Sequence, residues 1–198
     1  APIDYKPVAR HASAAAPEDV RDLITALIKA TNPIINAGQG VMYAEATPEL
    51  IEFVELTHIP VMTTLAGKSG FPENHRLALG TGASSGTLMV HRFLQSTDFI
   101  LGIGTSFTKT VFNAPLPTTI PLAQVTNCAE DLNKDYALAY GAVGDAKVVL
   151  RQMIEEVKRQ LGAQGRDDSN SVAERIAKIR SEWLAEWKPH LTSNEVPI

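Results

Sequence analysis

Residues 32–40 read Asn-Pro-Ile-Ile-Asn-Ala-Gly-Gln-Gly, and this stretch indicates the fold more clearly than any other. A short apolar run that follows a proline and ends at two glycines is typical of a buried strand that enters a tight turn. Similar runs occur at residues 59–64, 99–103 and 120–125, and a weaker one occurs at 136–143. The sequence therefore predicts about five buried strands.

Helical segments alternate with these strands, because apolar residues recur there at helical spacing. The hydroxyl of Thr47 and the carboxylate of Asp145 are expected to cap two of the helices, and Gly162 is expected to end the last of them. The predicted helices cover residues 17–30, 47–56, 88–94 and 145–161.

This alternation predicts an α/β fold, because each helix must carry the chain back across the sheet before the next parallel strand. We expect a three-layer, doubly wound and mainly parallel sheet of five to six strands, similar to the Rossmann-like domains that bind FAD or NAD. Residues 65–82 are rich in glycine and predict a long functional loop. A C-terminal linker helix from Ser171, with Trp183 and Trp187 on one face, is expected to end at Pro189.

Composition argues against several classes of function. The 198 residues are 44% apolar and 20% charged, which is typical of one globular domain. A net charge of −4 gives no basic surface for nucleic acid, and no apolar run is long enough for a membrane span. Cys128 is the single cysteine, so an internal disulfide is impossible and the reducing cytoplasm is the expected compartment.

Three turns that follow predicted strands are candidates for a ligand site. Ligands bind beyond the carboxyl ends of parallel strands, where glycines let backbone amides approach a phosphate. The same glycines could instead do no more than turn the chain, and the sequence leaves both interpretations open. The candidate cofactor-binding residues are Gly38, Gln39, Gly40, Thr64, Gly67, Lys68, Gly104, Thr105 and Ser106.

Standard cofactor motifs are not matched. The third glycine of the dinucleotide fingerprint would fall at Tyr43, and the first glycine of a P-loop would fall at Met62. These departures argue against the usual sites for NAD and for nucleoside triphosphates. The histidines lack the spacing of zinc ligands, so no metal site is predicted.

A hydrolase is a third hypothesis. A triad can be drawn from Ser84 or Ser85 with His75 and Asp98, but no Gly-x-Ser-x-Gly motif accompanies it. Cys128 has no basic neighbour in sequence that would activate it as a nucleophile. No catalytic residue is therefore assigned.

Several stretches together resemble one known family. Residues 32–40, 59–75 and 97–104 occur in the order seen in the central domain of thiamine-diphosphate-dependent enzymes of the acetolactate synthase, benzoylformate decarboxylase and oxalyl-CoA decarboxylase type. Residues 133–136 and 143–147 resemble the end of the same domain.

The resemblance implies a division of the chain into three parts, of which residues 16–162 form the central α/β domain. Residues 1–15 would be a linker from a missing pyrimidine-binding domain, and residues 163–198 a linker and helix that lead to a missing pyrophosphate-binding domain. The first residue is Ala1 rather than Met, which agrees with a fragment. The parent enzyme is expected to be a homodimer or homotetramer.

The resemblance also implies where the cofactors are held. The glutamate that activates thiamine diphosphate would lie in the preceding domain, and the Gly-Asp-Gly motif for Mg and diphosphate in the following one. Asp145, within Val-Gly-Asp-Ala, is interpreted as a helix cap rather than a metal ligand. The chain alone is therefore expected to be noncatalytic.

Some members of this family hold FAD or ADP at the strand ends, with an Arg at the position of Ser106 and an Asp at that of Thr108. Their acidic pair would fall at Thr126 and Cys128. Because these groups are absent here, a diphosphate loses a charge-assisted partner and FAD binding is disfavoured. The expected function is a structural spacer, with a vestigial nucleotide site, in an enzyme that acts on 2-oxo acids or related acyl donors. The alternative is a self-standing module that binds FAD, ADP or NAD.

Overall fold

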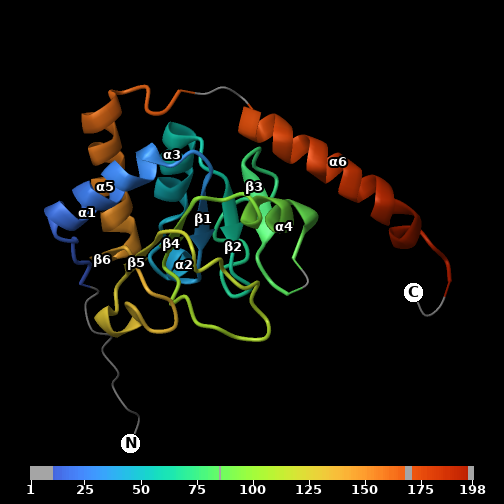
Figure 1. Cartoon of the computed structure of the whole chain (residues 1–198), viewed down its shortest axis with the longest axis horizontal. Helices are drawn as coiled ribbons and strands as arrows, with labels where there is room; N and C mark the ends of the chain where they lie inside the picture. The colour runs from blue at the N-terminus through green and yellow to red at the C-terminus, as the bar shows by residue number, and fades with distance from the viewer. Residues whose placement is uncertain (1–10, 85, 168–170, 196–198) are drawn as a thin grey trace, which may run out of the picture.

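Parallel strands form the centre of the molecule. The computed structural model describes residues 11–84, 86–167 and 171–195. Its strands are β1 (Pro33–Ala37), β2 (Val61–Thr63), β3 (Ala78–Thr81), β4 (Phe99–Ile103), β5 (Leu122–Thr126) and β6 (Tyr140–Val143). They form one six-stranded sheet in the order β3-β2-β1-β4-β5-β6, in which every neighbouring pair is parallel (Figure 1). The predicted α/β fold with a sheet of five to six strands is confirmed.

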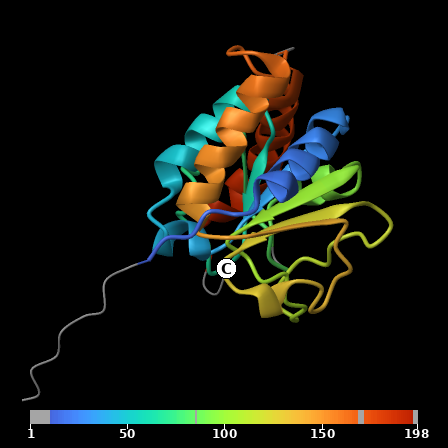
Figure 2. The same cartoon turned by 90° about the vertical axis from the view of Figure 1, so that its left-hand side faces the viewer.

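Helices cover both faces of the sheet. They are α1 (Pro17–Lys29), α2 (Gly40–Tyr43), α3 (Thr47–Thr57), α4 (Leu88–Leu94), α5 (Ala146–Leu161) and α6 (Ser171–Leu191), together with the 3-10 turn η1 (Ala129–Asp131). Because α3 and α4 belong to crossovers that run toward opposite edges of the sheet, they lie on opposite faces. The helix α5 packs against α1 and α3, and α6 packs against α4 (Figures 1 and 2). Within the described ranges, every helix is too short or too polar to span a bilayer.

The order of the strands creates a topological switch point between β1 and β4. The chain leaves β1 toward one edge of the sheet and leaves β4 toward the other, so the connections after these two strands diverge. This divergence opens a crevice at the carboxyl edge of the sheet, which is where ligands of open α/β sheets bind.

Two amide side chains, those of Asn36 and Gln124, lie buried on the central strands. Asn36, Gly102 and Gln124 are aligned across β1, β4 and β5. The ring of Phe107 lies on Gly102, where an added Cβ would be 2.8 Å from its Cε1 atom. Neither the Oδ1 atom of Asn36 nor the Oε1 atom of Gln124 accepts a hydrogen bond from the described residues. Unsatisfied buried oxygens next to a crevice are uncommon, so this row is relevant to the site.

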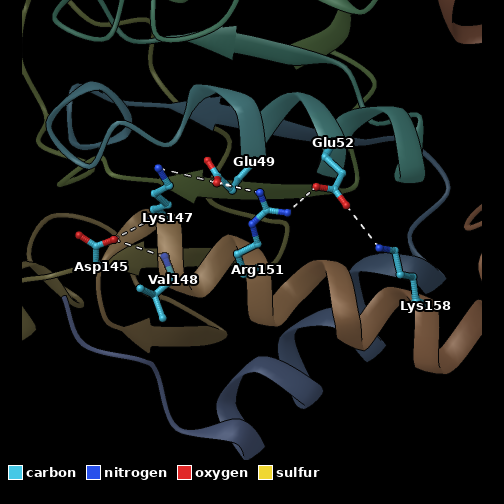
Figure 3. A network of polar contacts seen from close by, with 7 residues as sticks. All are labelled: Glu49, Glu52, Asp145, Lys147, Val148, Arg151 and Lys158. Atoms are coloured by element: carbon cyan, nitrogen blue, oxygen red, sulfur yellow. Dashed lines mark hydrogen bonds and ion pairs between the residues drawn. The ribbon is translucent and has the colours of Figure 1, made fainter.

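An ionic network joins α3 to α5 (Figure 3). The side chain of Glu49 is only 4% exposed, and its Oε1 atom lies 2.9 Å from Arg151 and 3.9 Å from Lys147. Arg151 also contacts Glu52 at 2.6 Å, and Lys158 contacts the same carboxylate at 3.3 Å. Charges of opposite sign therefore alternate along the interface of the two helices.

Several sequence predictions agree with the observed elements. The helix predicted over residues 88–94 and the strand predicted over 99–103 have the predicted bounds, and α1 ends one residue early. Asp145 caps α5, because its Oδ1 atom accepts hydrogen bonds from the amides of Lys147 and Val148 at 3.0 and 3.3 Å.

Other predictions were wrong. The loop predicted over residues 65–82 contains the strand β3. This strand was not recognised in the sequence because it contains Gly80, at φ +98°, and pairs with β2 in an irregular register. Thr47 is not a cap, because α3 is preceded by Ala46 and the Thr47 hydroxyl donates to the carbonyl of Gly70 at 3.0 Å.

The ends of two more elements also differ from the predictions. The last strand covers only Tyr140–Val143 rather than residues 136–143. Tyr136 precedes it and packs against Phe107, which lies in the connection after β4. Pro189 lies inside α6, which continues to Leu191, because a proline so close to the end removes few helical hydrogen bonds.

Residues 13–15 of the predicted linker pack on α5. The Ala15 amide donates to Gln152 Oε1 at 2.9 Å, and Gln152 Nε2 donates to the Ala15 carbonyl at 3.0 Å. The Asp145 amide donates to the Ser13 carbonyl at 2.9 Å. The boundary at residue 16 remains a prediction, and residues 1–10 lie outside the described residues.

Candidate functional site

A crevice of about 590 Å³ lies at the switch point between β1 and β4. The turns after β1, β2 and β4 meet there, as the sequence predicted. Of the nine candidate residues, seven line the crevice: Gly38, Gln39, Gly40, Thr64, Gly104, Thr105 and Ser106.

The other two candidates, Gly67 and Lys68, lie outside this lining. Gly67 packs against β1, where an added Cβ would be 2.5 Å from the Ala37 carbonyl oxygen. The Lys68 ammonium forms an ion pair with Glu73. The turn after β2 therefore reaches the crevice through Thr64, Leu65 and Ala66 rather than through its glycine and its lysine.

The glycine amides of the three turns are already used within the protein. The amides of Gly38, Gly40 and Gly104 donate to the carbonyls of Ile103, Gly104 and Val125, each at 2.9 Å. The Gly67 amide donates to Thr64 Oγ1 at 3.0 Å. A phosphate bound here could not receive these hydrogen bonds without breaking contacts between the strands.

Close packing of backbones explains why glycines occupy two of these positions. A Cβ on Gly38 would overlap the carbonyl of Gly104, and a Cβ on Gly40 would lie 2.7 Å from the Gly104 Cα. Gly104 itself adopts φ +61°, which favours glycine. The glycines therefore allow the turns after β1 and β4 to approach each other closely.

Residues beyond the nine candidates supply the rest of the crevice wall. The connection after β4 contributes Thr108, Thr110 and Asn113, and the end of β5 with the segment after it contributes Thr126, Asn127 and Asp131. The family resemblance had already placed cofactor contacts of FAD-holding members at the positions of Thr108 and Thr126, whereas only the abundance of Thr and Asn after each strand could have indicated Thr110, Asn113 and Asn127. The Ser106 and Thr108 hydroxyls are 2.7 Å apart.

The lining of the crevice is almost uncharged and mixes hydroxyl and amide groups with apolar side chains. Asp131 is its only ionisable side chain apart from the Tyr43 phenol, and no Lys, Arg or His belongs to the lining among the described residues. The rim is apolar and exposed, because Tyr43, Leu65 and Phe112 are 74%, 53% and 65% accessible. The site thus combines an apolar mouth with hydroxyl and amide walls.

Phe107 fixes the wall of the crevice. It is buried at φ +48°, an unusual conformation for a bulky residue, and its ring makes an edge contact with Tyr136 at 6.2 Å. Below it lies a small cavity of about 30 Å³ that is lined in part by Asn36, Thr105 and Thr108. The crevice and this cavity share Thr64, Thr105, Thr108 and Asn113, so they adjoin.

The hydrolase hypothesis finds no support in the geometry. His75 Nε2 pairs with Glu55 Oε1 at 2.6 Å, and Asp98 accepts hydrogen bonds from the amides of Thr31 and Asn32. His75 and Asp98 therefore bind residues outside the proposed triad. Ser85 lies outside the described residues.

The Cys128 thiol is not activated. It donates a hydrogen bond to Glu130 at 3.1 Å, and this bond raises the pKa of the thiol. A raised pKa lowers the population of the nucleophilic thiolate.

Metal ligands do not gather in the part of the chain that the structure describes, where no group of three His, Cys, Asp or Glu side chains could hold an ion. The residues of the crevice offer a magnesium ion one carboxylate, that of Asp131, and offer a diphosphate no cation. They also fit poorly to FAD or ADP, because the crevice offers a diphosphate neither a cation nor a free glycine amide.

The order of the strands and the crevice at their carboxyl ends define a doubly wound α/β domain with three layers. Comparison with known proteins then gives the family. Residues 20–153 match the family "Thiamine pyrophosphate enzyme, central domain", and the chain belongs to it. The resemblance found in the sequence is confirmed.

Individual relatives agree with this assignment. The chain is 34% identical over 167 residues to an acetolactate synthase of Mycobacterium avium, and this aligned region covers 83% of the chain and 26% of that protein. It is 30% identical over 169 residues to a probable acetolactate synthase large subunit of Methanococcus aeolicus, with 83% and 28% covered. The chain thus spans about a quarter of the length of these relatives.

A solved structure has the same fold. Benzoylformate decarboxylase from Polynucleobacter necessarius superposes with a TM-score of 0.67 at 20% identity, over 86% of this chain and 32% of that one. At this identity the likeness concerns the fold alone.

Proposed function

We propose that the chain is the noncatalytic central domain of a thiamine-diphosphate- and magnesium-dependent enzyme that forms or cleaves a carbon–carbon bond next to a carbonyl. The substrate class would be 2-oxo acids or related acyl donors. The family match over residues 20–153 and the names of the relatives support this proposal. The reaction would be that of a transferase or lyase similar to acetolactate synthase.

One observation carries the noncatalytic part of the proposal. The family assignment covers the α/β domain itself, yet the glycine amides at its ligand edge donate within the domain: those of Gly38 and Gly40 join β1 to β4, and that of Gly104 joins β4 to β5. A domain whose glycine amides at the strand ends donate to its own carbonyls, rather than to a phosphate, is suited to a scaffold. It would space the pyrimidine-binding and pyrophosphate-binding domains of the parent.

The remaining features of the parent follow from the same proposal. Residues 16–162 would be the central domain, with linkers on both sides to the domains that hold thiamine diphosphate and Mg. The parent would be a cytoplasmic homodimer or homotetramer, as the resemblance implies. The site residues at the three turns would form a vestigial nucleotide site that no longer binds a diphosphate.

A self-standing module for FAD, ADP or NAD is the second candidate, and the crevice at the switch point favours it. The lack of a cation in the lining argues against it. Micromolar affinity for any of the three dinucleotide or nucleotide cofactors in calorimetry would promote this candidate over the scaffold.

The coding sequence on either side of the chain tests the first proposal. We expect a preceding domain that carries the activating glutamate and a following domain that carries a Gly-Asp-Gly motif. A reading frame that contains neither domain would refute the proposal.

A further inference from the structure

A second cavity, the α4–α6 cavity, lies where α6 packs beside α4 (Figure 1). It has a volume of about 740 Å³, within the range of roughly 300–1,000 Å³ that is usual for sites of small molecules. Its lining shares no residue with the lining of the crevice at the switch point. We propose that the α4–α6 cavity binds a small organic ammonium ion with an aromatic or other apolar body. This inference goes beyond the proposed function and does not depend on it.

Much of the lining of the α4–α6 cavity is apolar. The helix α4 contributes Leu88, Val90 and Leu94, and the connection between β4 and β5 contributes residues 114–117, which read Ala-Pro-Leu-Pro. Contact with such side chains removes the apolar surface of a ligand from water, and this removal favours binding. The walls are therefore suited to the hydrocarbon part of a ligand.

Both tryptophans of the chain belong to this lining. Trp183 and Trp187 are four residues apart on α6, so their indoles lie on the same face of the helix. Trp183 packs against the core, whereas Trp187 is 46% exposed. Because the face of an indole attracts a cation more strongly than the face of a phenol or phenyl ring, the two side chains favour a positively charged ligand.

The charge of the lining has the sign that such a ligand requires. Glu186 is the only Asp, Glu, Lys or Arg among the described residues of the lining, and it forms no ion pair within the described part of the chain. His91 also belongs to the lining, and its Nε2 atom lies 3.0 Å from Gln95 Nε2. An amide nitrogen only donates, so this ring nitrogen accepts and the imidazole is neutral. The lining thus carries a negative charge that an ammonium ion can neutralise.

The partly buried arginines of α6 bind elsewhere. Arg175 Nη2 donates to Ser96 Oγ at 2.8 Å, and its guanidinium lies over the ring of Phe93, 4.3 Å from the centroid. Arg180 Nη2 donates to the Ala78 carbonyl at 2.8 Å. Neither arginine belongs to the lining of the α4–α6 cavity. A ligand that carries a carboxylate or phosphate would therefore meet Glu186 without a facing cation, and its binding is disfavoured.

Titration of the chain at neutral pH with three phenyl compounds of similar size tests the proposal. Phenethylamine carries an ammonium group, phenethyl alcohol a hydroxyl group and hydrocinnamate a carboxylate. Since both tryptophans of the chain line the cavity, quenching of tryptophan fluorescence reports binding at this place, and calorimetry measures the affinity independently. We expect saturable binding of phenethylamine, with an affinity about fivefold or more above that of the alcohol and about tenfold or more above that of hydrocinnamate.

A charge variant tests the selectivity directly. Glu186→Gln should lower the affinity for phenethylamine by about fivefold and leave the affinity for phenethyl alcohol unchanged, because only the ammonium group meets the carboxylate. Glu182→Gln is the matched control, since Glu182 is an exposed residue of the same helix outside the lining, and it should change neither affinity.

Three results would overturn the proposal. The first is an absence of saturable binding of phenethylamine. The second is an affinity for phenethyl alcohol or hydrocinnamate that equals or exceeds that for phenethylamine. The third is an equal effect of Glu186→Gln and Glu182→Gln on the binding of phenethylamine.

Discussion

The backbone atoms around Gly38 leave no space for any side chain at this position of the switch point. A Cβ at this position would lie 2.7 Å from the Gly104 carbonyl carbon and the Thr105 Cα, all of which are backbone atoms that cannot rotate away. Gly38→Ala must therefore push the turns after β1 and β4 apart. We expect a loss of about 3 kcal/mol or more in the free energy of unfolding, measured by urea denaturation.

Gly162 supplies the control for this substitution. It adopts φ +83° and ψ 176° but has open space around its Cβ position, so Gly162→Ala should cost only the conformational strain of roughly 1–3 kcal/mol. If Gly38→Ala lowered the free energy of unfolding no more than Gly162→Ala, the turns after β1 and β4 would not be in close contact at Gly38.

Gly102 in β4 and Phe107 in the connection that follows β4 are in direct contact. Gly102→Ala places a Cβ inside the Phe107 ring, and Phe107→Ala removes a buried ring at a cost of roughly 3–5 kcal/mol. In the double variant, the alanine at residue 102 meets no ring. A double-mutant cycle should therefore show that Gly102→Ala costs at least about 1 kcal/mol less in the Phe107→Ala background. Additive costs would contradict the packing described.

Sequence reasoning reached some of these residues and not others. It identified seven residues of the crevice, because turns after parallel strands converge at one edge regardless of loop detail. It could not decide whether the glycines contact a ligand or only turn the chain, because that depends on the distance between two turns more than 60 residues apart. The family resemblance indicated the position of Thr108, but Asn113 and Asp131 lie in loops without a periodic pattern, so their places in the crevice were not predictable.

Arg151 connects two elements, α3 and α5. Its loss would leave the buried Glu49 carboxylate with only Lys147 at 3.9 Å. Arg151→Met should lower the free energy of unfolding by roughly 1–3 kcal/mol, because a buried charge then lacks its best partner. The double variant Glu49→Leu, Arg151→Met should recover most of this loss in urea denaturation.

Lys158→Met is the matched control, since it breaks an exposed pair with Glu52 and should change stability by no more than about 0.5 kcal/mol. If Lys158→Met and Arg151→Met had equal effects, burial of Glu49 would not be the cause.

Glu156 links α5 to α1 and should make this contact dependent on pH. Hydrogen bonds from Arg159 lower the pKa of its carboxyl to about 2, and Gln160 connects the same carboxylate to Thr25. Because the folded-state pKa is below the ordinary value of 4.5, the stabilisation is complete above pH 4.5 and is lost as the pH falls toward 2.

Urea denaturation at a series of pH values checks this dependence. Glu156→Gln should flatten the decline of stability below pH 4.5. Glu155→Gln should not, because the side chain of Glu155 is 76% exposed. Parallel declines in Glu156→Gln and the unmodified chain would contradict the assignment.

At the scale of elements, strong periodic patterns were predictable and local exceptions were not. The apolar runs of β1 and β4 and the capped helix α5 follow from composition and spacing alone. The strand β3 was missed because it is four residues long and contains Gly80 at positive φ. Tertiary pairing with β2 supplies the stability that its own sequence lacks.

The whole molecule has two features on separate surfaces. The crevice lies at the carboxyl edge of the sheet, whereas α6 packs on α4 and carries Trp183 half-buried and Trp187 at 46% exposure. The stripe predicted on this helix is therefore only partly covered. The chain belongs to the family of the thiamine pyrophosphate enzyme central domain, and it spans about a quarter of the length of its acetolactate synthase relatives.

Calorimetric titration with thiamine diphosphate in the presence of Mg²⁺ tests the central claim most directly, on this chain and on the protein encoded by its complete reading frame. The proposed function predicts saturable binding by the complete protein and no binding by residues 1–198 alone, because the diphosphate and metal groups would be held by other domains. Saturable binding by the 198-residue chain, or no binding by the complete protein, would contradict it.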